Sequence, residues 1–281
     1  MGARRIGDIR ELCDLVKPDY ALFTGVCAQH VESFGSEENV FKGKSEILQA
    51  VKQNAVCGAA LQPKIEEATW LNAEEKAKCT FVDFENCLSD VELSATKTRF
   101  ALTLPSGEKI SVTTSLLGRH AAENMALVAY MAYALGLNAS EIQRGLERVT
   151  PIPHRLELIE NGGVYILDDS YNSNPRGAAE AIEALGRFSG RKFVVTPGLV
   201  ETGILEEELG KAFGKMLVGL DEVILIGETQ IECVKEGYAL GGGETEKLHV
   251  FPTLERAQAY LQNKLNIGDC VLFLNDLPDV Y

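Results

Sequence analysis

The second half of the chain alternates short apolar runs with amphipathic segments, and this alternation restricts the fold more than any other feature of the sequence. Each apolar run is bounded by polar or turn-forming residues, which is typical of buried parallel strands. Strands are predicted at residues 164–167, 192–196, 222–226, 248–251 and 270–274, with helices at residues 177–188, 206–218, 230–238 and 254–265. Because crossovers between parallel strands are right-handed, this order predicts a small doubly wound, Rossmann-like domain.

The first half also alternates strands and helices, which favours the α/β class for the whole chain. Apolar runs predict strands at residues 20–26, 55–62 and 78–84. Between residues 99 and 114 the apolar period changes to two, around the turn Pro105-Ser106-Gly107-Glu108. This change predicts a β-hairpin, an antiparallel appendage to a mainly parallel sheet.

Two further helices are predicted at residues 120–135 and 139–149, the second capped by Asn138 or Ser140. The segment Thr150-Pro151-Ile152-Pro153 then predicts a stiff, extended connector, because proline fixes its own φ and restricts the residue before it. With 281 residues the chain is long enough for two domains. We place them at residues 1–149 and 150–281.

The stretch from Pro153 to Pro175 reads PHRLELIENGGVYILDDSYNSNP and carries the densest polar chemistry of the chain. Two short strands meet at Asn161-Gly162-Gly163, and the second ends in carboxylates, hydroxyls and amides before Pro175 opens a helix. Ligands of α/β proteins bind at the carboxyl ends of the strands. The stretch therefore predicts one lip of a ligand site.

Composition excludes several classes of partner. The net charge is −14 and the basic residues are dispersed, so nucleic acid is not expected as a partner. Seven cysteines without a C-x-x-C pair suggest neither a disulfide framework nor a zinc ribbon. No apolar run approaches the roughly 18 residues that span a bilayer, and no signal-peptide pattern opens the chain, so we expect a soluble, cytoplasmic protein without membrane insertion.

Gly43-Lys44-Ser45 looks like the end of a phosphate-binding P-loop, but the rest of the pattern is missing. The motif needs a glycine five residues before Gly43, where this chain has Glu38. No other G-x-x-x-x-G-K-[ST] occurs in the 281 residues. The usual phosphate cradle is therefore not encoded in them.

Four stretches together resemble the Mur ligases of peptidoglycan synthesis. They are GARRIGDIRELCDLVKPDY with HVESFGSEENVFKGKSEI, GRHAAENMALVAYMAYALGL, the stretch from Pro153 to Pro175, and VVTPGLVETG. DDSYNSNP after HRLE is most similar to the branch of the family that joins D-Ala-D-Ala to a UDP-MurNAc-tripeptide. The resemblance implies that residues 1–149 form the latter part of a mainly parallel ATPase-type central domain with a β-hairpin, and that residues 150–281 form the Rossmann-like C-terminal domain.

The same resemblance implies that a UDP-sugar domain and the P-loop would lie before Met1. In the family a glutamate directly precedes the Met-Gly pair and helps to hold magnesium, so that ligand is missing as well. We therefore expect an incomplete ligase that is inactive by itself and monomeric. Its reaction would use ATP and Mg²⁺ to convert the peptide carboxylate into an acyl phosphate, which the amine of D-Ala-D-Ala then attacks.

Residue by residue, His30 resembles the family's magnesium-site histidine and Lys44 the lysine that becomes a carbamate and helps to organise the metal. The alternatives are a solvated loop histidine and a solvated lysine near the start of a helix. Asn124 resembles one of two asparagines that contact adenine. The other is replaced by Ala121, so one set of hydrogen bonds to the base is absent.

Arg155 resembles the arginine that clamps the transferring phosphoryl group, although a plain ion pair with Glu157 or Asp168 is the alternative. Asp169 resembles the residue that holds the nucleotide ribose, while Asp168 is expected only to finish its strand. Asn172 and Asn174 are expected to line the active cleft, with helix capping as the alternative.

Glu201 and Thr202 follow another strand at the same edge and are expected to face the amine substrate. Two other functions are also compatible with the sequence. One is a non-catalytic binding or regulatory module derived from a Mur ligase, suggested by Ala121 and by the missing phosphate cradle. The other is a related amide ligase such as a folylpolyglutamate synthase, against which DDSYNSNP argues.

Overall fold

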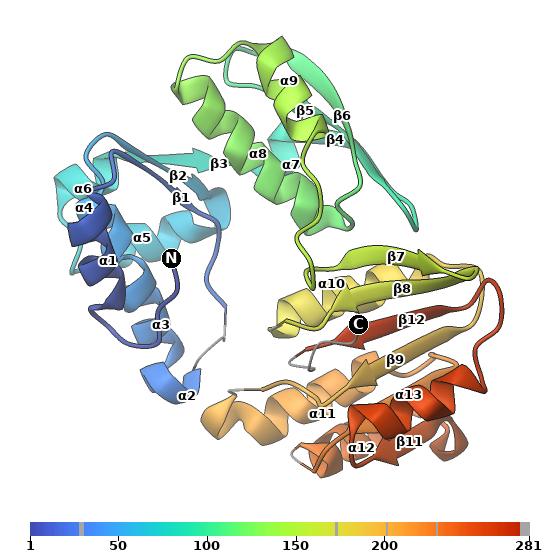
Figure 1. Ribbon diagram of the computed structural model, residues 1–281. Helices are drawn as coiled ribbons and strands as arrows, with labels where there is room; N and C mark the ends of the chain where they lie inside the picture. The colour runs from blue at the N-terminus through green and yellow to red at the C-terminus, as the bar shows by residue number, and fades with distance from the viewer. Residues whose placement is uncertain (28–30, 172–173, 201, 229, 276–281) are drawn as a thin grey trace. The chain divides into compact units, whose positions relative to one another are not determined.

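The computed structural model describes residues 1–27, 31–171, 174–200, 202–228 and 230–275, and the chain divides into two compact units. The first comprises Met1–Leu93, Thr98–Thr114 and Arg119–Val149. The second comprises Thr150–Tyr281 together with two short pieces of the first half, Ser94–Lys97 and Ser115–Gly118. Figure 1 shows the elements of both units.

The first unit contains a parallel sheet in the order β1-β2-β3, formed by β1 (Tyr20–Phe23), β2 (Asn54–Gly58) and β3 (Cys79–Val82). Strand β1 is shorter than the predicted 20–26. The hydrophobic core around this sheet contains apolar side chains of the strands and of the surrounding helices, among them Phe23, Phe41, Leu48 and Ile65. These helices are α1 (Asp8–Val16), α2 (Val31–Phe34), α3 (Glu37–Lys44), α4 (Glu46–Ala50), α5 (Gln62–Glu67) and α6 (Ala73–Ala77).

Glu46 is a buried carboxylate that holds the start of α1. Its two oxygens accept hydrogen bonds from the backbone N–H groups of Gly7 and Arg10, at 2.8 and 3.0 Å. The first turn of a helix has N–H groups without intrahelical partners and a partial positive charge. Helix α1 has no side-chain cap of its own. Glu46, which is distant in sequence, therefore acts as its N-terminal cap.

The predicted hairpin belongs to a separate sheet rather than to an extension of the parallel one. Strands β5 (Thr98–Thr103) and β6 (Lys109–Thr114) pair as expected, but β4 (Leu88–Leu93) pairs with β5 and makes a three-stranded antiparallel sheet. Three helices accompany it, α7 (Phe84–Cys87), α8 (Arg119–Ala134) and α9 (Ala139–Glu147). Helix α8 contacts strands of both sheets, and Asn138 caps α9.

The second unit is a six-stranded sheet in the order β11-β10-β9-β12-β8-β7, in which only β7 is antiparallel to its neighbour. The strands are β7 (Glu157–Asn161), β8 (Val164–Asp169), β9 (Lys192–Thr196), β10 (Glu222–Ile226), β11 (Leu248–Phe251) and β12 (Cys270–Leu274). The helices are α10 (Pro175–Gly186), α11 (Glu206–Met216), α12 (Ile231–Leu240) and α13 (Leu254–Gln262). The predicted α/β class and the doubly wound second domain are confirmed.

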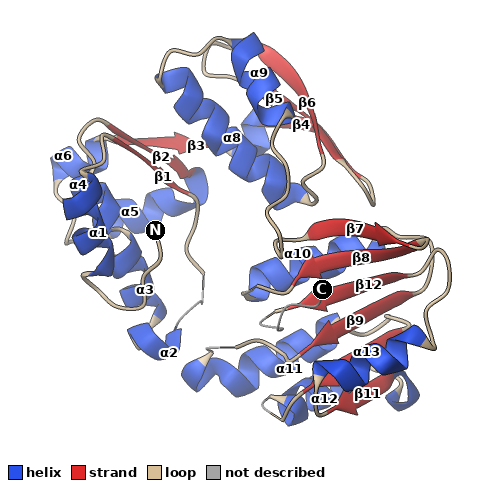
Figure 2. Cartoon of the chain, in the orientation of Figure 1, coloured by secondary structure: helices blue, strands red, loops and turns tan. Residues whose placement is uncertain are grey.

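Helices cover both faces of this sheet (Figure 2). Helices α10, α11 and α12 pack against one face over Leu167, Val194 and Val223, and α13 packs against the other over Phe193 and Phe273. Because α13 crosses on the opposite face, it brings β12 back between β9 and β8. The sheet therefore reverses its strand order at β12, which is where doubly wound folds place their ligands.

Among the described residues, no helix is long and apolar enough to cross a membrane.

Candidate active site

The polar residues of the second unit gather where β8, β9 and β12 end, at the point where the strand order reverses. Asp168 and Asp169 are the last residues of β8, Gly198 follows β9, and Asn275 follows β12. The backbone N–H of Asn275 donates to the carbonyl of Asp169 at 3.0 Å. This hydrogen bond joins the end of β12 to the end of β8.

Asp168 is a fully buried carboxylate at the centre of a hydrogen-bonded cluster. Its Oδ2 lies 2.8 Å from Nδ1 of His154, and its Oδ1 accepts from the backbone N–H and the hydroxyl of Ser170 at 3.1 and 2.6 Å. His154 is thus one partner of Asp168, and β8 ends one residue later than the strand end expected at Asp168. The backbone of His154 is left-handed, with a φ of 64°.

The two residues after His154 also contact the end of β8 and the residues that follow it. The guanidinium carbon of Arg155 lies 4.1 Å from the ring centroid of Tyr171, and the N–H of Leu156 donates to Oδ1 of Asp169 at 3.1 Å. Leu156 also has a positive φ, of 49°. Three consecutive residues are thus fastened to the end of β8, and the exposed Arg155 is the cation at this edge that the sequence had singled out.

The loop after β9 is fastened in a similar way. Oε1 of Gln230 accepts from the N–H of Leu199 and its Nε2 donates to the hydroxyl of Thr202, both at 3.0 Å. Nδ2 of Asn275 donates to the carbonyl of Gly198 at 2.6 Å. Thr202 is buried, which fits a residue that orients the loop from within as well as one that faces a substrate.

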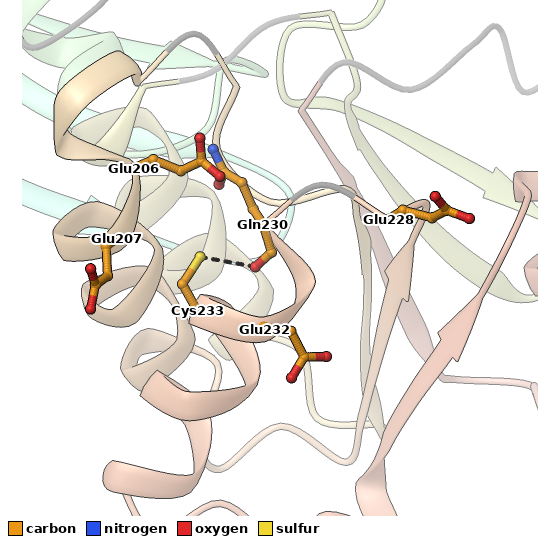
Figure 3. A pocket seen from close by; sticks show the side chains of 6 residues that line it. All are labelled: Glu206, Glu207, Glu228, Gln230, Glu232 and Cys233. Atoms are coloured by element: carbon orange, nitrogen blue, oxygen red, sulfur yellow. Dashed lines mark hydrogen bonds between the residues drawn. The ribbon is translucent and has the colours of Figure 1, made fainter.

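A pocket of about 320 Å³ lies beside this loop, between the starts of α11 and α12 (Figure 3). It is lined by Gln230, by Cys233 and by four glutamates, Glu206, Glu207, Glu228 and Glu232. Burial raises the pKa of the Cys233 thiol, and the nearby glutamate charges raise it further. The thiol therefore stays protonated near neutral pH, which argues against a nucleophilic role.

Lys44 is the last residue of α3 and is half-buried, so the expectation that it lies near the start of a helix is wrong. The turn at Ser45 separates α3 from α4, because the Ser45 hydroxyl donates to the carbonyl of Lys42 and accepts from Trp70 Nε1. A Cβ on Gly43 would lie 2.7 Å from the ring of Phe34. Gly43 thus serves helix packing, in agreement with the view that Gly43-Lys44-Ser45 is not a phosphate cradle.

Asn124 lies in α8 with an exposed side chain, while Ala121, one turn earlier, is buried. Asn124 and Lys44 both belong to the first unit, whereas Arg155, Asp169, Asn174 and Thr202 belong to the second. Asn174 caps α10, with its Oδ1 accepting from the N–H of Gly177 at 3.0 Å.

Three of the predicted site residues, His30, Asn172 and Glu201, lie outside the described residues. Within the described ranges, no group of three histidine, cysteine, aspartate or glutamate side chains could hold a metal ion.

Sequence reasoning did not single out Gln230 and Asn275, and it named His154 without giving it a role. Each acts through a partner at least 14 residues away in the chain. Local patterns carry no such information. A polar residue directly after a buried strand, as at Asn275, was the one available signal.

Comparison with known proteins identifies both halves of the chain. Residues 1–132 match the family profile described as "Mur ligase middle domain", and residues 154–275 match "Mur ligase, glutamate ligase domain". The chain is 29% identical over 281 residues to the UDP-N-acetylmuramoyl-tripeptide--D-alanyl-D-alanine ligase of Bacillus subtilis, covering 97% of this chain and 60% of that one. The Escherichia coli ligase of the same name is 27% identical over 241 residues, covering 81% and 52%.

Among solved structures, the MurF ligase of Thermotoga maritima in complex with ADP superimposes with a TM-score of 0.82 at 27% identity, covering 98% of this chain and 62% of that one. The chain thus spans between half and two thirds of the length of these three proteins. Matches to the middle and C-terminal domains follow one another along the sequence in the family's order. This chain belongs to the Mur ligase family.

Proposed function

We propose that this chain provides part of an ATP-dependent ligase that joins D-Ala-D-Ala to a UDP-MurNAc-tripeptide. Residues 1–149 would supply the latter part of the central domain and residues 150–281 the C-terminal domain. One observation carries the proposal: the alignment with the B. subtilis ligase, which bears this activity in its name, extends over 97% of the chain. The polar edge at β8, β9 and β12 supports the proposal, because a cation and carboxylates lie at the strand ends there.

The residues at this edge fit a nucleotide. Arg155 presents an exposed guanidinium, which suits the non-bridging oxygens of a phosphate. Asp169 accepts from the N–H of Leu156 through Oδ1, and the family resemblance assigns to it the hydroxyls of the nucleotide ribose. Asn124 belongs to the first unit and not to this edge, and its proposed contact with adenine comes from the family resemblance alone.

In this reaction ATP supplies the phosphoryl group that converts the peptide carboxylate into a reactive acyl phosphate. Arg155 would stabilise the negative charge that spreads over the equatorial oxygens during transfer. Its stacking on Tyr171 limits the directions in which the guanidinium can point. Less conformational freedom is then lost when the phosphate binds.

The amine substrate is assigned to the same edge. Thr202 and Asn174, with Glu201 and Asn172 from the undescribed positions, would orient the amine of D-Ala-D-Ala toward the acyl carbon. Orientation of this kind contributes most when water is excluded, since water competes with the amine for the acyl phosphate.

Magnesium is proposed from the family resemblance, with His30 and Lys44 as its residues. The described residues alone do not form a metal cluster. No step of the reaction is therefore assigned to the metal.

A non-catalytic binding module is the second candidate. Ala121 stands where a second adenine-binding asparagine is expected, and these 281 residues contain no P-loop pattern. Such a module would bind a protein of cell-wall synthesis instead of the dipeptide.

Calorimetric titration of the 281-residue chain with D-Ala-D-Ala tests the choice between these functions, with L-Ala-L-Ala as a matched control. The ligase proposal expects saturable binding of the D,D dipeptide and at least tenfold weaker binding of the L,L dipeptide, roughly one lost hydrogen-bond contact or steric clash. Absence of D-Ala-D-Ala binding would count against the ligase proposal. Binding to a cell-wall ligase in that same outcome would support the module.

A further inference from the structure

One peptide group in the loop after β9 is held at both ends by side-chain amides. Its carbonyl is that of Gly198, which accepts from Nδ2 of Asn275 at 2.6 Å. Its N–H is that of Leu199, which donates to Oε1 of Gln230 at 3.0 Å. The plane of the Gly198–Leu199 peptide is therefore fixed from two directions by residues of two other loops.

Gln230 also reaches further along the same loop. Its Nε2 donates to the hydroxyl of Thr202 at 3.0 Å. Oε1 and Nε2 of Gln230 therefore both bind the loop after β9, one at Leu199 and the other at Thr202. Gln230 lies directly before α12, so this contact ties the loop after β9 to the start of that helix.

Asn275 makes a second connection. Its backbone N–H donates to the carbonyl of Asp169 at 3.0 Å while its side chain holds Gly198. One fully buried residue therefore connects the end of β8, which carries Asp169, with the loop that carries Thr202.

Both residues adopt a left-handed backbone conformation, which glycine tolerates best and asparagine better than glutamine. Gln230 has a φ of 60° and Asn275 a φ of 65°, in the left-handed region that glycine occupies most easily. Gly198 has a φ of 97°, and a Cβ there would lie 3.0 Å from Oε1 of Gln230. Glycine would suit the backbone at 230 and 275 better, so the amides are present despite a conformational cost.

We infer that Gln230 and Asn275, called here the amide clamp, are positioning residues for the incoming amine substrate. They set the orientation of the Gly198–Leu199 peptide and of Thr202 relative to Asp169. This inference rests on the proposed function, because Thr202 is assigned there to the amine substrate. The clamp itself need not touch the dipeptide.

Glycine variants separate positioning from a purely structural role. Gln230→Gly and Asn275→Gly each remove one arm of the clamp and at the same time relieve the left-handed backbone. Lys17→Gly is the matched control, because Lys17 also has a positive φ, of 51°, but ends α1 in the first unit. We expect thermal unfolding midpoints within about 3 °C of the wild-type value for all three variants.

Two readouts are then compared. Hydrogen exchange of the Leu199 amide should be about tenfold faster or more in Gln230→Gly, because its acceptor is lost. The Kd for D-Ala-D-Ala should rise about tenfold in both clamp variants, the equivalent of one hydrogen bond, and stay unchanged in Lys17→Gly.

Unchanged exchange at Leu199 in Gln230→Gly would overturn the inference, since the loop would not depend on the clamp. Faster exchange with an unchanged Kd would also overturn it, because the clamp would then hold the loop without serving the substrate. Failure of the wild-type chain to bind D-Ala-D-Ala would defeat the proposed function together with this inference. Normal wild-type binding with unaffected variants would defeat the inference alone.

Discussion

Left-handed backbone at non-glycine residues is concentrated at the candidate active site. Six described non-glycine residues have positive φ, and His154, Leu156, Gln230 and Asn275 all lie at the carboxyl edge of the second sheet. Each such residue costs roughly 1 kcal/mol. At each of the four, a hydrogen bond holds the residue to a neighbouring loop or strand end. Strain held in this way is typical of sites that must be preorganised.

Asp168 is the residue on which this edge depends most. Replacement of Asp168 by alanine would remove the buried acceptor that His154 and Ser170 share and leave only the longer 3.3 Å contact between their side chains, at a cost of about 3 kcal/mol in the free energy of unfolding. Asp168→Asn keeps one acceptor oxygen and should cost about half as much. Urea unfolding of both variants measures the difference. Equal stability of Asp168→Ala and wild type would show that the cluster contributes nothing to folding.

Asp269 predicts a pH dependence of stability. Burial raises the pKa of this carboxyl. Hydrogen bonds from the Arg191 guanidinium and from the backbone N–H groups of Asn266 and Arg191 outweigh this effect and lower the pKa below its ordinary value of 3.8. The unfolded state therefore binds the proton more tightly than the folded state. The contribution to stability is complete above about pH 4 and is lost as pH falls through the lower folded value.

The variant Asp269→Asn isolates this contribution. The difference in unfolding free energy between wild type and variant should be largest near neutral pH and should shrink below about pH 4. Denaturant midpoints measured between about pH 2 and pH 7 test the sign. A difference that grew as pH fell would contradict it.

At the scale of elements, strands buried on both faces could be predicted closely. Residues 192–196, 222–226 and 270–274 match β9, β10 and β12, because a continuous apolar run between polar residues has few other structures open to it. Strand β4 escaped prediction because its sequence LSDVEL is half polar and mostly not buried. Asp90, with a φ of 53°, interrupts its register between Ser89 and Glu92. Such a bulge breaks the period of two.

Helices α11 and α12 approach closely because glycines face the contact, Gly214 from α11 and Gly237 from α12 among them. A Cβ on Gly237 would collide with the backbone of Lys211, and one on Gly214 would collide with the carbonyl of Val234. Gly237→Ala should therefore lower the free energy of unfolding by about 3 kcal/mol, since backbone must move to make room. Helix propensity alone would change it by about 1 kcal/mol in the opposite direction.

Gly186→Ala in α10 serves as the control, because nothing lies within 4 Å of its added Cβ. It should be neutral or slightly stabilising. Chemical denaturation of both variants gives the comparison. A neutral Gly237→Ala would mean that the two helices can separate at little cost.

At the scale of the whole molecule, the sequence indicated the family and the general location of the site but not the contacts within it. Asp169, Asn174 and Thr202 could be singled out because they lie near a strand end or precede a helix and because the family resemblance falls on these stretches. His154, Gln230 and Asn275 could not be assigned, since each depends on a partner brought close only by the fold. Similarly, Leu117 precedes the predicted boundary at 149 but is buried in the core of the second unit. Its position in the sequence gives no sign of this.

The 281 residues by themselves are predicted not to release phosphate from ATP. Holding the β- and γ-phosphates for transfer needs a nest of backbone N–H groups and a lysine, which a P-loop provides. The chain contains no such pattern, and in Gly43-Lys44-Ser45 the glycine packs against Phe34 while the serine is bonded to Lys42 and Trp70. In the proposed arrangement Arg155 stabilises the transferring phosphoryl group and Asp169 contacts the ribose, and neither supplies that nest of backbone N–H groups.

A phosphate-release assay with ATP, Mg²⁺, UDP-MurNAc-tripeptide and D-Ala-D-Ala measures this directly. We expect the rate to equal that of the Arg155→Ala variant and of a protein-free blank. Release above the blank that requires both the tripeptide and the dipeptide, and that is lost in Arg155→Ala, would refute the prediction. It would also mean that these residues hold the phosphates by a route other than a P-loop. Dipeptide binding without release is the result expected if the substrate-binding half of the reaction is encoded here and the phosphate cradle is not.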